Sequence, residues 1–118
     1  MGAEARRAQR EVINRYLKVY DAETDRFLGY LVDITPVGAM LQSKEEIDPQ
    51  ERFTLRMELP EEMDGSNQII VDAESRWDKK EENALFHHTG FEFLNIPQDE
   101  EARVRKLMES YKLEGFPG

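Results

Sequence analysis

Cysteine is absent from this chain of 118 residues, and histidine occurs only twice. Without a thiol, neither a disulfide framework nor a thiolate metal site can form, which fits a reducing compartment. No apolar run approaches the roughly 20 residues that a membrane-spanning helix needs. The N-terminal segment MGAEARRAQR has no apolar stretch behind its arginines, as a secretory signal would. The sequence therefore predicts a cytoplasmic protein that does not insert into membranes.

Catalytic motifs are missing as well. The two histidines, His87 and His88, are neighbours in a predicted strand, so their side chains point to opposite faces and cannot easily act as a pair. Neither a G-x-S-x-G nucleophile elbow nor a glycine-rich phosphate loop occurs. Pairs of adjacent glutamates fall in predicted loops, where solvated surface is the simplest interpretation. We expect no catalytic activity, no metal site and no cofactor.

Charge is abundant and unevenly distributed. The net charge is -9, yet residues 1–15 carry four arginines and two glutamates, so this segment holds +2 and the remainder holds -11. A strongly acidic body repels polyanions such as DNA and RNA at long range. A basic segment on that body can still bind one small anion by direct contact, because fields are screened beyond about 10 Å. The charge predicts a small anion or a protein as the partner, and no nucleic acid.

Short runs of alternating apolar and polar residues predict a mainly β fold. They are followed near the C-terminus by one amphipathic segment with helical period. The predicted strands cover residues 16–21, 27–34, 38–43, 52–60, 68–77 and 85–96, and the predicted helix lies within 97–116. This order predicts a single domain, residues 16–118, in which a small antiparallel β-barrel or sandwich carries one helix. A flexible, arginine-rich arm, residues 1–15, precedes it.

Strict alternation assigns the side chains of each strand to two faces. In residues 27–34 it puts Asp33 and Leu31 on one face, opposite Leu28, Tyr30, Val32 and Ile34. In residues 68–77 it puts Trp77 on the same face as Ile69, Val71 and Ala73. The predicted helix presents an apolar face made of Val104, Leu107, Met108 and Tyr111, and its end is marked by Lys112 and Gly115.

The segment DITPVG, residues 33–38, interrupts the alternation after the second predicted strand. Asp, Thr, Pro and Gly each favour a turn, and we predict one here. The same turn would bring the Asp33 carboxylate, the Thr35 hydroxyl and the bare backbone of Gly38 against a ligand. Glycine at position 38 permits a positive φ angle and a close approach of the ligand.

Two motifs together resemble the bacterial PilZ domain family. Arg6 and Arg10 match the R-x-x-x-R motif that precedes the first strand, and residues 33–38 match [D/N]-x-S-x-x-G after the second strand, with Thr35 in place of serine. The order and separation of the motifs, the sequence GFEF in a late strand and the closing helix agree with the family over essentially the whole chain. Glu11 departs from the apolar residue that the family often has at that position.

The resemblance implies a six-stranded β-barrel that binds the second messenger cyclic di-GMP. In the family the arginines contact phosphates and guanine, and the second motif contacts guanine edges. Guanidinium groups suit both targets, because their fork of donors matches phosphate oxygens and the O6/N7 edge of guanine. The implied ligand-binding residues are Arg6, Arg10, Asp33, Thr35 and Gly38, with the adjacent Arg7 as a further candidate.

Two residues have a second interpretation. Arg15 stands closest to the barrel and is the alternative to Arg10 as the site arginine. Trp77 could stack on a guanine, since base stacking on an aromatic side chain contributes about 1–3 kcal/mol. Its apolar neighbours on the strand nevertheless favour core packing for Trp77.

The resemblance also implies a relay to another molecule. We expect ligand binding to order the arm, so that Arg6 and Arg10 close over the ligand and create a surface for an unidentified downstream protein. Some relatives with degraded motifs are nucleotide-independent adaptors that act through protein contacts, which is the alternative function. The polar termini suggest a free-standing domain, and the sequence leaves its oligomeric state open.

Overall fold

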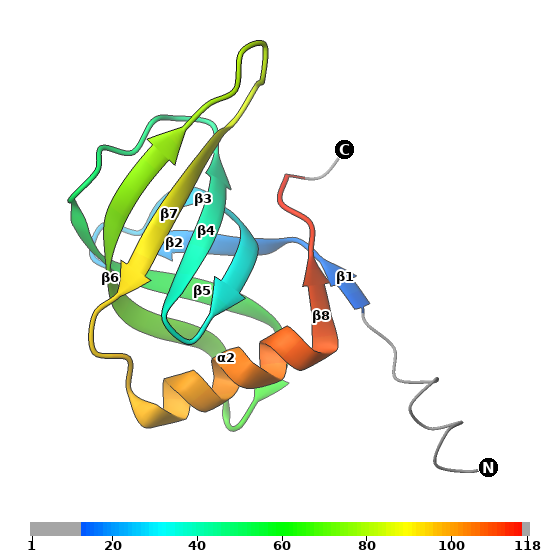
Figure 1. Cartoon of the computed structure of the whole chain (residues 1–118). Coiled ribbons are helices and arrows are strands. Elements are labelled where there is room, and N and C mark those ends of the chain that lie inside the picture. The colour runs from blue at the N-terminus through cyan, green and yellow to red at the C-terminus, as the bar shows by residue number, and fades with distance from the viewer. Residues whose placement is uncertain (1–12, 117–118) are drawn as a thin grey trace.

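The computed structural model describes residues 13–116, and its main body is a closed β-barrel with one helix at its end (Figure 1). The six barrel strands follow one another around the barrel in the order β2-β3-β4-β7-β6-β5, all antiparallel. Their bounds are Leu17–Asp21 for β2, Arg26–Thr35 for β3, Gly38–Ser43 for β4, Arg52–Met63 for β5, Ser66–Lys79 for β6 and His87–Phe93 for β7. The predicted fold class, a six-stranded barrel with a C-terminal helix, is confirmed.

Two short strands lie outside the barrel. Strand β1 (Ile13–Arg15) pairs in parallel with β8 (Tyr111–Leu113), so the last three residues of the predicted arm are joined to the segment that follows the helix. Residues 1–12, which include Arg6, Arg7 and Arg10, lie outside the described part. The division of the chain into an arm and a barrel at residue 15 stays a prediction.

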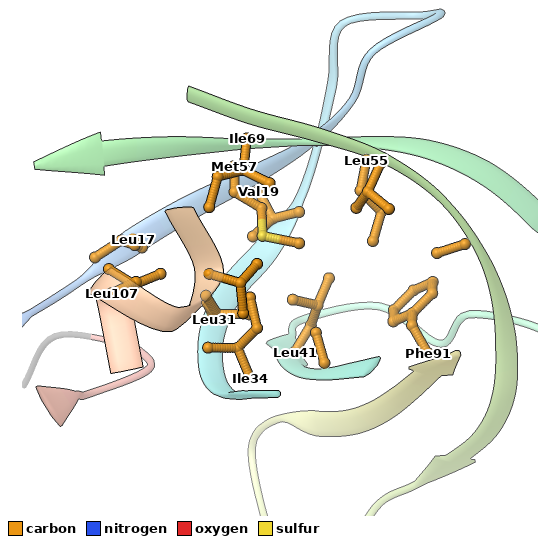
Figure 2. Packing of buried hydrophobic residues seen from close by; sticks show 14 of the residues in the cluster. Leu17, Val19, Leu31, Ile34, Leu41, Leu55, Met57, Ile69, Phe91 and Leu107 are labelled. Carbon is orange, nitrogen blue, oxygen red and sulfur yellow. The ribbon is translucent and has the colours of Figure 1, made fainter. Parts of the chain in front are cut away.

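Buried apolar side chains fill the barrel (Figure 2). Every strand contributes alternate residues, as a barrel requires, because successive side chains point to its inside and outside. Leu17, Val19, Leu41, Leu55, Met57 and Ile69 are all nearly or completely inaccessible to solvent. Among residues 13–116 there is no helix long and apolar enough to cross a membrane.

Helix α2 (Gln98–Ser110) closes one end of the barrel by burying Val104 and Leu107. Its first turn carries three acidic residues, which the positive end of the helix dipole favours. Arg103 fastens the helix to the β5–β6 turn, since its guanidinium donates to the carbonyl oxygens of Met63 at 3.1 Å and Asp64 at 3.0 Å. The helix thereby holds the strands at this end of the barrel in place.

The predicted helix end is wrong. Tyr111 has φ -133° and ψ 145°, so the chain leaves the helix after Ser110 and becomes β8. Tyr111 is buried, but as a strand residue, whereas Met108 is 45% exposed and does not join the apolar face. The pairing of β8 with β1 outweighs the helical periodicity of these residues, because a strand partner supplies backbone hydrogen bonds that the sequence pattern does not reveal.

Strict alternation fails in β3 for a related reason. The pairing of β3 shifts register at two places, opposite Val19/Tyr20 in β2 and between Leu31 and Asp33 opposite β4. Each shift inserts one extra residue, a β-bulge, and reverses the faces of the residues beyond it. Leu31 is consequently buried in the core while Asp33 is exposed, contrary to the prediction that they share a face.

The predicted loop at residues 61–67 is mostly strand. β5 continues to Met63 and β6 begins at Ser66, so only Asp64 and Gly65 remain as a turn. Both have positive φ, 49° and 82°, which fits the conformation that Asp-Gly turns adopt. The strands on both sides of this turn are therefore longer than the 52–60 and 68–77 that their apolar patterns indicated.

Candidate functional site

The DITPVG segment is the turn that the sequence predicted. Pro36 and Val37 connect β3 to β4, and Thr35 pairs with Gly38 across the hairpin. The Val37 backbone N–H donates to the Thr35 hydroxyl oxygen at 3.2 Å, so this side chain stabilises the turn. The hydroxyl hydrogen of Thr35 can still be donated to a ligand, because a hydroxyl both accepts and donates.

Gly38 is required for close packing of backbones and not for a positive φ angle. Among the described glycines only Gly65 and Gly115 have positive φ, so that part of the prediction is wrong. A Cβ atom at position 38 would lie 2.4 Å from the carbonyl oxygen of Phe91 in the neighbouring strand β7. Glycine therefore allows β4 to approach β7 at the point where the turn begins.

Asp33 projects from the barrel because of the β-bulge that precedes it. Its Oδ1 accepts a hydrogen bond from the backbone N–H of Ile34 at 3.0 Å. Among the residues that the structure describes, Asp33 has no cationic partner. A carboxylate has two oxygens and several acceptor positions, so Asp33 retains capacity for hydrogen-bond donors from a ligand.

An open pocket of about 260 Å³ brings these three residues together. Its walls come from the end of β3, from β4 and from the facing parts of β6 and β7. The lining residues are Asp33, Thr35, Gly38, Ala39, Met40, Arg76, Trp77, Gly90 and Phe91. The pocket thus combines carboxylate and hydroxyl groups with an apolar floor and an aromatic wall, as small-molecule sites commonly do.

Trp77 forms the aromatic wall, and the prediction that it packs in the core is wrong. Its side chain is 44% exposed, because the pairing of β6 with β7 shifts register between Ser75 and Trp77. Ser75 remains buried, and Trp77 turns outward beyond the shift. The indole lies over Gly90, where a Cβ atom would be only 2.3 Å from two of its ring atoms. Glycine at position 90 leaves space for the indole beside the strand.

Arg76 is a pocket residue that sequence reasoning missed. Its guanidinium forms an ion pair with Glu92 and a longer one with Glu74, at 3.5 Å, and its side chain is about half exposed. Both carboxylates compete for the same guanidinium that an anionic ligand would contact. The only sequence signal was a basic residue directly before the tryptophan, and that signal acquires meaning only once the bulge is known.

Arg15, the alternative site arginine, does not line this pocket. Its guanidinium carbon lies 5.7 Å from the centroid of the Tyr111 ring, in the range of a cation–π contact. Tyr111 lines a neighbouring pocket of about 350 Å³, which shares Asp33 with the first. The Tyr111 hydroxyl donates to Glu61, and this hydrogen bond raises the pKa of Tyr111. Arg15 is therefore next to the second pocket.

A separate buried cluster surrounds Asp78 at the far end of β6. Its carboxylate, 6% exposed, accepts hydrogen bonds from the Ile47 backbone N–H at 3.0 Å and the Thr89 hydroxyl at 2.8 Å, and contacts His87 Nδ1 at 2.7 Å. Burial raises the pKa of Asp78, but these hydrogen bonds outweigh it and hold the pKa below its ordinary value. The cluster joins the loop after β4 to β6 and β7. Residues 13–116 contain no group of three side chains suited to hold a metal ion.

Comparison with known proteins identifies the fold and the family. The chain matches the family described as PilZ domain over residues 4–110. Among solved structures, "Structure of Bacillus subtilis Inhibitor of motility (MotI/DgrA)" is similar, with a TM-score of 0.59 and 16% sequence identity, covering 77% of this chain and 43% of that chain. The matched region thus spans less than half of that chain, and at this identity the likeness concerns the fold. Curated proteins give no significant match.

The family match covers the β-barrel, the turn with Asp33, Thr35 and Gly38, and the segment that contains Arg6 and Arg10. The six-stranded barrel with its closing helix agrees with the fold that the resemblance implied. This protein belongs to the PilZ domain family, a family of cyclic di-GMP receptors and adaptors.

Proposed function

We propose that this protein binds cyclic di-GMP at the pocket between the β3–β4 turn and Trp77, and relays binding to a partner protein. The observation that carries the proposal is the convergence of Asp33, Thr35 and Gly38, from one motif, with an exposed tryptophan and an arginine from β6. These groups come from strands that are far apart in the sequence.

The chemistry of the pocket suits a guanine. The Asp33 carboxylate can accept hydrogen bonds from the N–H edge of the base, and the Thr35 hydroxyl can donate to an acceptor on it. The indole of Trp77 offers a flat surface for stacking, and it is exposed. At about 260 Å³ the pocket is smaller than the roughly 300–1,000 Å³ of sites that enclose a complete ligand. It would accordingly hold one part of cyclic di-GMP, and the arm would cover the rest.

Arginines of the arm would neutralise the two phosphates. Arg6 and Arg10 are assigned this role by the family motif, with Arg7 as an additional contact. The position of β1 supports the assignment, because β1 pairs with β8, and Tyr111 and Leu113 of β8 line the second pocket together with Asp33. Ile13, where the described part of the chain begins, is paired with Tyr111 and therefore lies near the second pocket, which shares Asp33 with the first. In this proposal, ligand binding orders the arm, and the ordered arm contributes to the surface that a partner recognises.

Calorimetric titration with cyclic di-GMP tests the proposal. We expect saturable heat with the unchanged protein and none with Arg10→Ala, because the arginine–phosphate contacts are lost. Arg15→Ala is the matched control and should bind with nearly unchanged affinity, since Arg15 lies against Tyr111. If Arg15→Ala abolishes the heat and Arg10→Ala does not, the two arginines exchange roles. No heat with the unchanged protein would refute nucleotide binding.

A nucleotide-independent adaptor is the second candidate. The ion pairs of Arg76 with Glu74 and Glu92 favour it, because they place negative charge beside the pocket where a dianionic ligand would lie. An adaptor would bind its partner equally well with and without cyclic di-GMP. Titrating the partner in both conditions separates the two functions.

A further inference from the structure

A second surface on the barrel is built from aromatic side chains and is distinct from the nucleotide pocket. Six rings form a continuous chain of contacts, with centroid distances between 4.3 and 6.4 Å. We call this surface the aromatic face, and it consists of Tyr16, Tyr20, Phe27, Tyr30, Phe86 and Phe116. None of the six belongs to the buried core cluster.

The backbone turns these rings outward for identifiable reasons. β2 places Leu17 and Val19 inside the barrel, so Tyr20 and Lys18 point outside, in line with Tyr16 just before the strand. In β3 the extra residue Leu28 points into the core, which leaves Phe27 and Tyr30 both facing outward. Phe27 and Tyr30 are then close enough for an edge-to-face contact at 5.4 Å.

The C-terminal segment adds Phe116 to the face. After β8 the chain runs back beside the barrel (Figure 1), and the Phe116 backbone N–H donates to the Gln42 side chain at 2.7 Å. The Phe116 ring packs against Tyr30 at 4.8 Å and stacks on Phe86 at 4.3 Å. Two elements outside the barrel strands, the β6–β7 loop and the C-terminal segment, thus extend the face instead of covering it.

Part of the aromatic face remains open to solvent. Tyr16 is 48% exposed and Phe27 is 40% exposed, although both are large and mostly apolar. Exposed rings scattered singly would need no explanation, but rings joined in one patch are typical of an interaction site. Beside Phe27 lies a pocket of about 230 Å³ with an apolar floor of Leu28 and Ile47, and with Arg26, Lys44 and Glu45 at its rim.

Four basic side chains border this face: Lys18, Arg26, Lys44 and Arg56. Arg56 lies over the Tyr20 ring at 4.7 Å and Lys44 over the Phe116 ring at 5.8 Å. Lys18 is the cross-strand neighbour of Tyr30. Arg56 and Arg26 are paired with Asp25 and Glu45, at 2.8 and 3.1 Å. Lys18 and Lys44 form no ion pair with any residue between 13 and 116, so their charges are available to a partner.

We propose that the aromatic face docks a partner protein through a segment that carries an aromatic or large apolar side chain next to acidic residues. The apolar side chain would enter the pocket beside Phe27, and the carboxylates would contact Lys44 and Lys18. Interface anchors of this kind combine aromatic residues with arginine in a desolvated centre. The inference names the partner chemistry of the relay in the proposed function, and it depends on that function only in requiring a partner.

A nucleic acid fits the face less well. Four of the five ring contacts are edge-to-face, with interplanar angles between 64° and 78°, so the rings do not present parallel surfaces for successive bases. The net charge of -9 also opposes a polyanion, whereas a short acidic segment meets only the local positive charge.

Peptide selection tests the docking surface with a defined probe. A phage-displayed library of random linear peptides is selected on the unchanged protein, and the enriched peptides are synthesised and titrated calorimetrically. We expect a consensus with Asp or Glu beside Trp, Phe or Leu. Phe27→Ser and Lys44→Glu should each weaken binding by about tenfold or more, which is the size of effect at an interface anchor. Both residues are on the surface, so the fold should be retained, and circular dichroism checks it.

Two variants on α2 serve as controls. Met108→Ser removes an apolar side chain of similar exposure on α2, and Arg105→Glu reverses a charge there; both should bind the peptide normally. Peptides without acidic residues, no enrichment at all, or unchanged affinity of Phe27→Ser and Lys44→Glu would overturn the proposal. It would also fail if those variants instead abolish binding of oligothymidylate or self-association in sedimentation. Phe27→Ser and Lys44→Glu should bind cyclic di-GMP with unchanged affinity. If the unchanged protein does not bind cyclic di-GMP, only the nucleotide site is refuted.

Discussion

The two halves of β3 serve different surfaces although they belong to one strand. The first half, around Phe27 and Tyr30, is part of the aromatic face, and the second half, from Asp33 to Thr35, is part of the nucleotide pocket. A β-bulge lies in each half and turns a different kind of side chain outward. The comparison shows that one device, an extra residue that keeps the core filled while reversing the outer face, can build two unlike sites.

The largest expected effect is on stability, and it compares two glycines. An added Cβ would face backbone at Gly29 and a side chain at Gly90. Gly29→Ala should lower the free energy of unfolding by about 3 kcal/mol, at the upper end of overpacking costs, because its Cβ would lie 2.4 Å from the Gln42 carbonyl oxygen. Gly90→Ala should cost about 1 kcal/mol or less, since only the exposed Trp77 has to move. Urea denaturation measures both. Equal losses of unfolding free energy in the two variants would show that the Trp77 side chain cannot move to make room for a Cβ atom.

The next prediction tests whether the second half of β3, from Asp33 to Thr35, contributes to nucleotide binding and not to peptide binding. Asp33→Ala should weaken cyclic di-GMP binding by about 2 kcal/mol, or roughly 30-fold, which is typical for loss of a side chain that reads a base edge. It should leave binding of the acidic peptide to the aromatic face unchanged. Glu62→Ala, which removes an exposed carboxylate from β5, is the charge-matched control in calorimetry. Loss of a negative charge alone should strengthen binding of a dianionic ligand, so Glu62→Ala should not weaken it. Equal affinities of Asp33→Ala and Glu62→Ala would refute a base contact by Asp33.

Acid should lower the stability of the protein by protonating the Asp78 carboxylate, which joins the loop after β4 to β6 and β7. Its pKa is lowered in the folded state, so its stabilising contribution is complete above the pKa of the unfolded chain and is lost as the pH falls through the folded value. Asp78→Asn should therefore be less stable than the unchanged protein by about 1 kcal/mol at neutral pH, the size of one hydrogen bond. This difference should shrink below about pH 4. Thermal unfolding across this range would contradict the assignment if the difference grows in acid.

The smallest expected effect concerns the carboxylate of Glu92, which pairs with Arg76 beside the pocket. Glu92→Gln frees Arg76 from one carboxylate and removes a negative charge near the ligand. We expect cyclic di-GMP affinity to rise by about threefold, since an exposed ion pair contributes about 0.2–1 kcal/mol. Binding of the acidic peptide at the aromatic face should not change. A fall in affinity would indicate that Glu92 positions Arg76 for the ligand.

Much of the site could be predicted from local sequence. The turn at residues 33–38 follows from the conformational preferences of Asp, Thr, Pro and Gly, and these act within a few residues. The Asp-Gly turn and the acidic first turn of α2 were predictable for the same reason. Trp77 and Arg76 were not, because their directions depend on a register shift against β7, and Gly90, which gives the indole its space, is distant in sequence.

By itself, the sequence determined the fold class, the turn that carries Asp33, Thr35 and Gly38, and the family to which the chain belongs. Periodicity and turn preference are short-range properties, so they are legible in a single chain. Only the tertiary structure decided which side chains leave the core at bulges, where the helix ends, and that six aromatic rings meet on one face. These outcomes depend on which strands pair and in what register, and pairing between distant segments is settled by packing of the whole barrel.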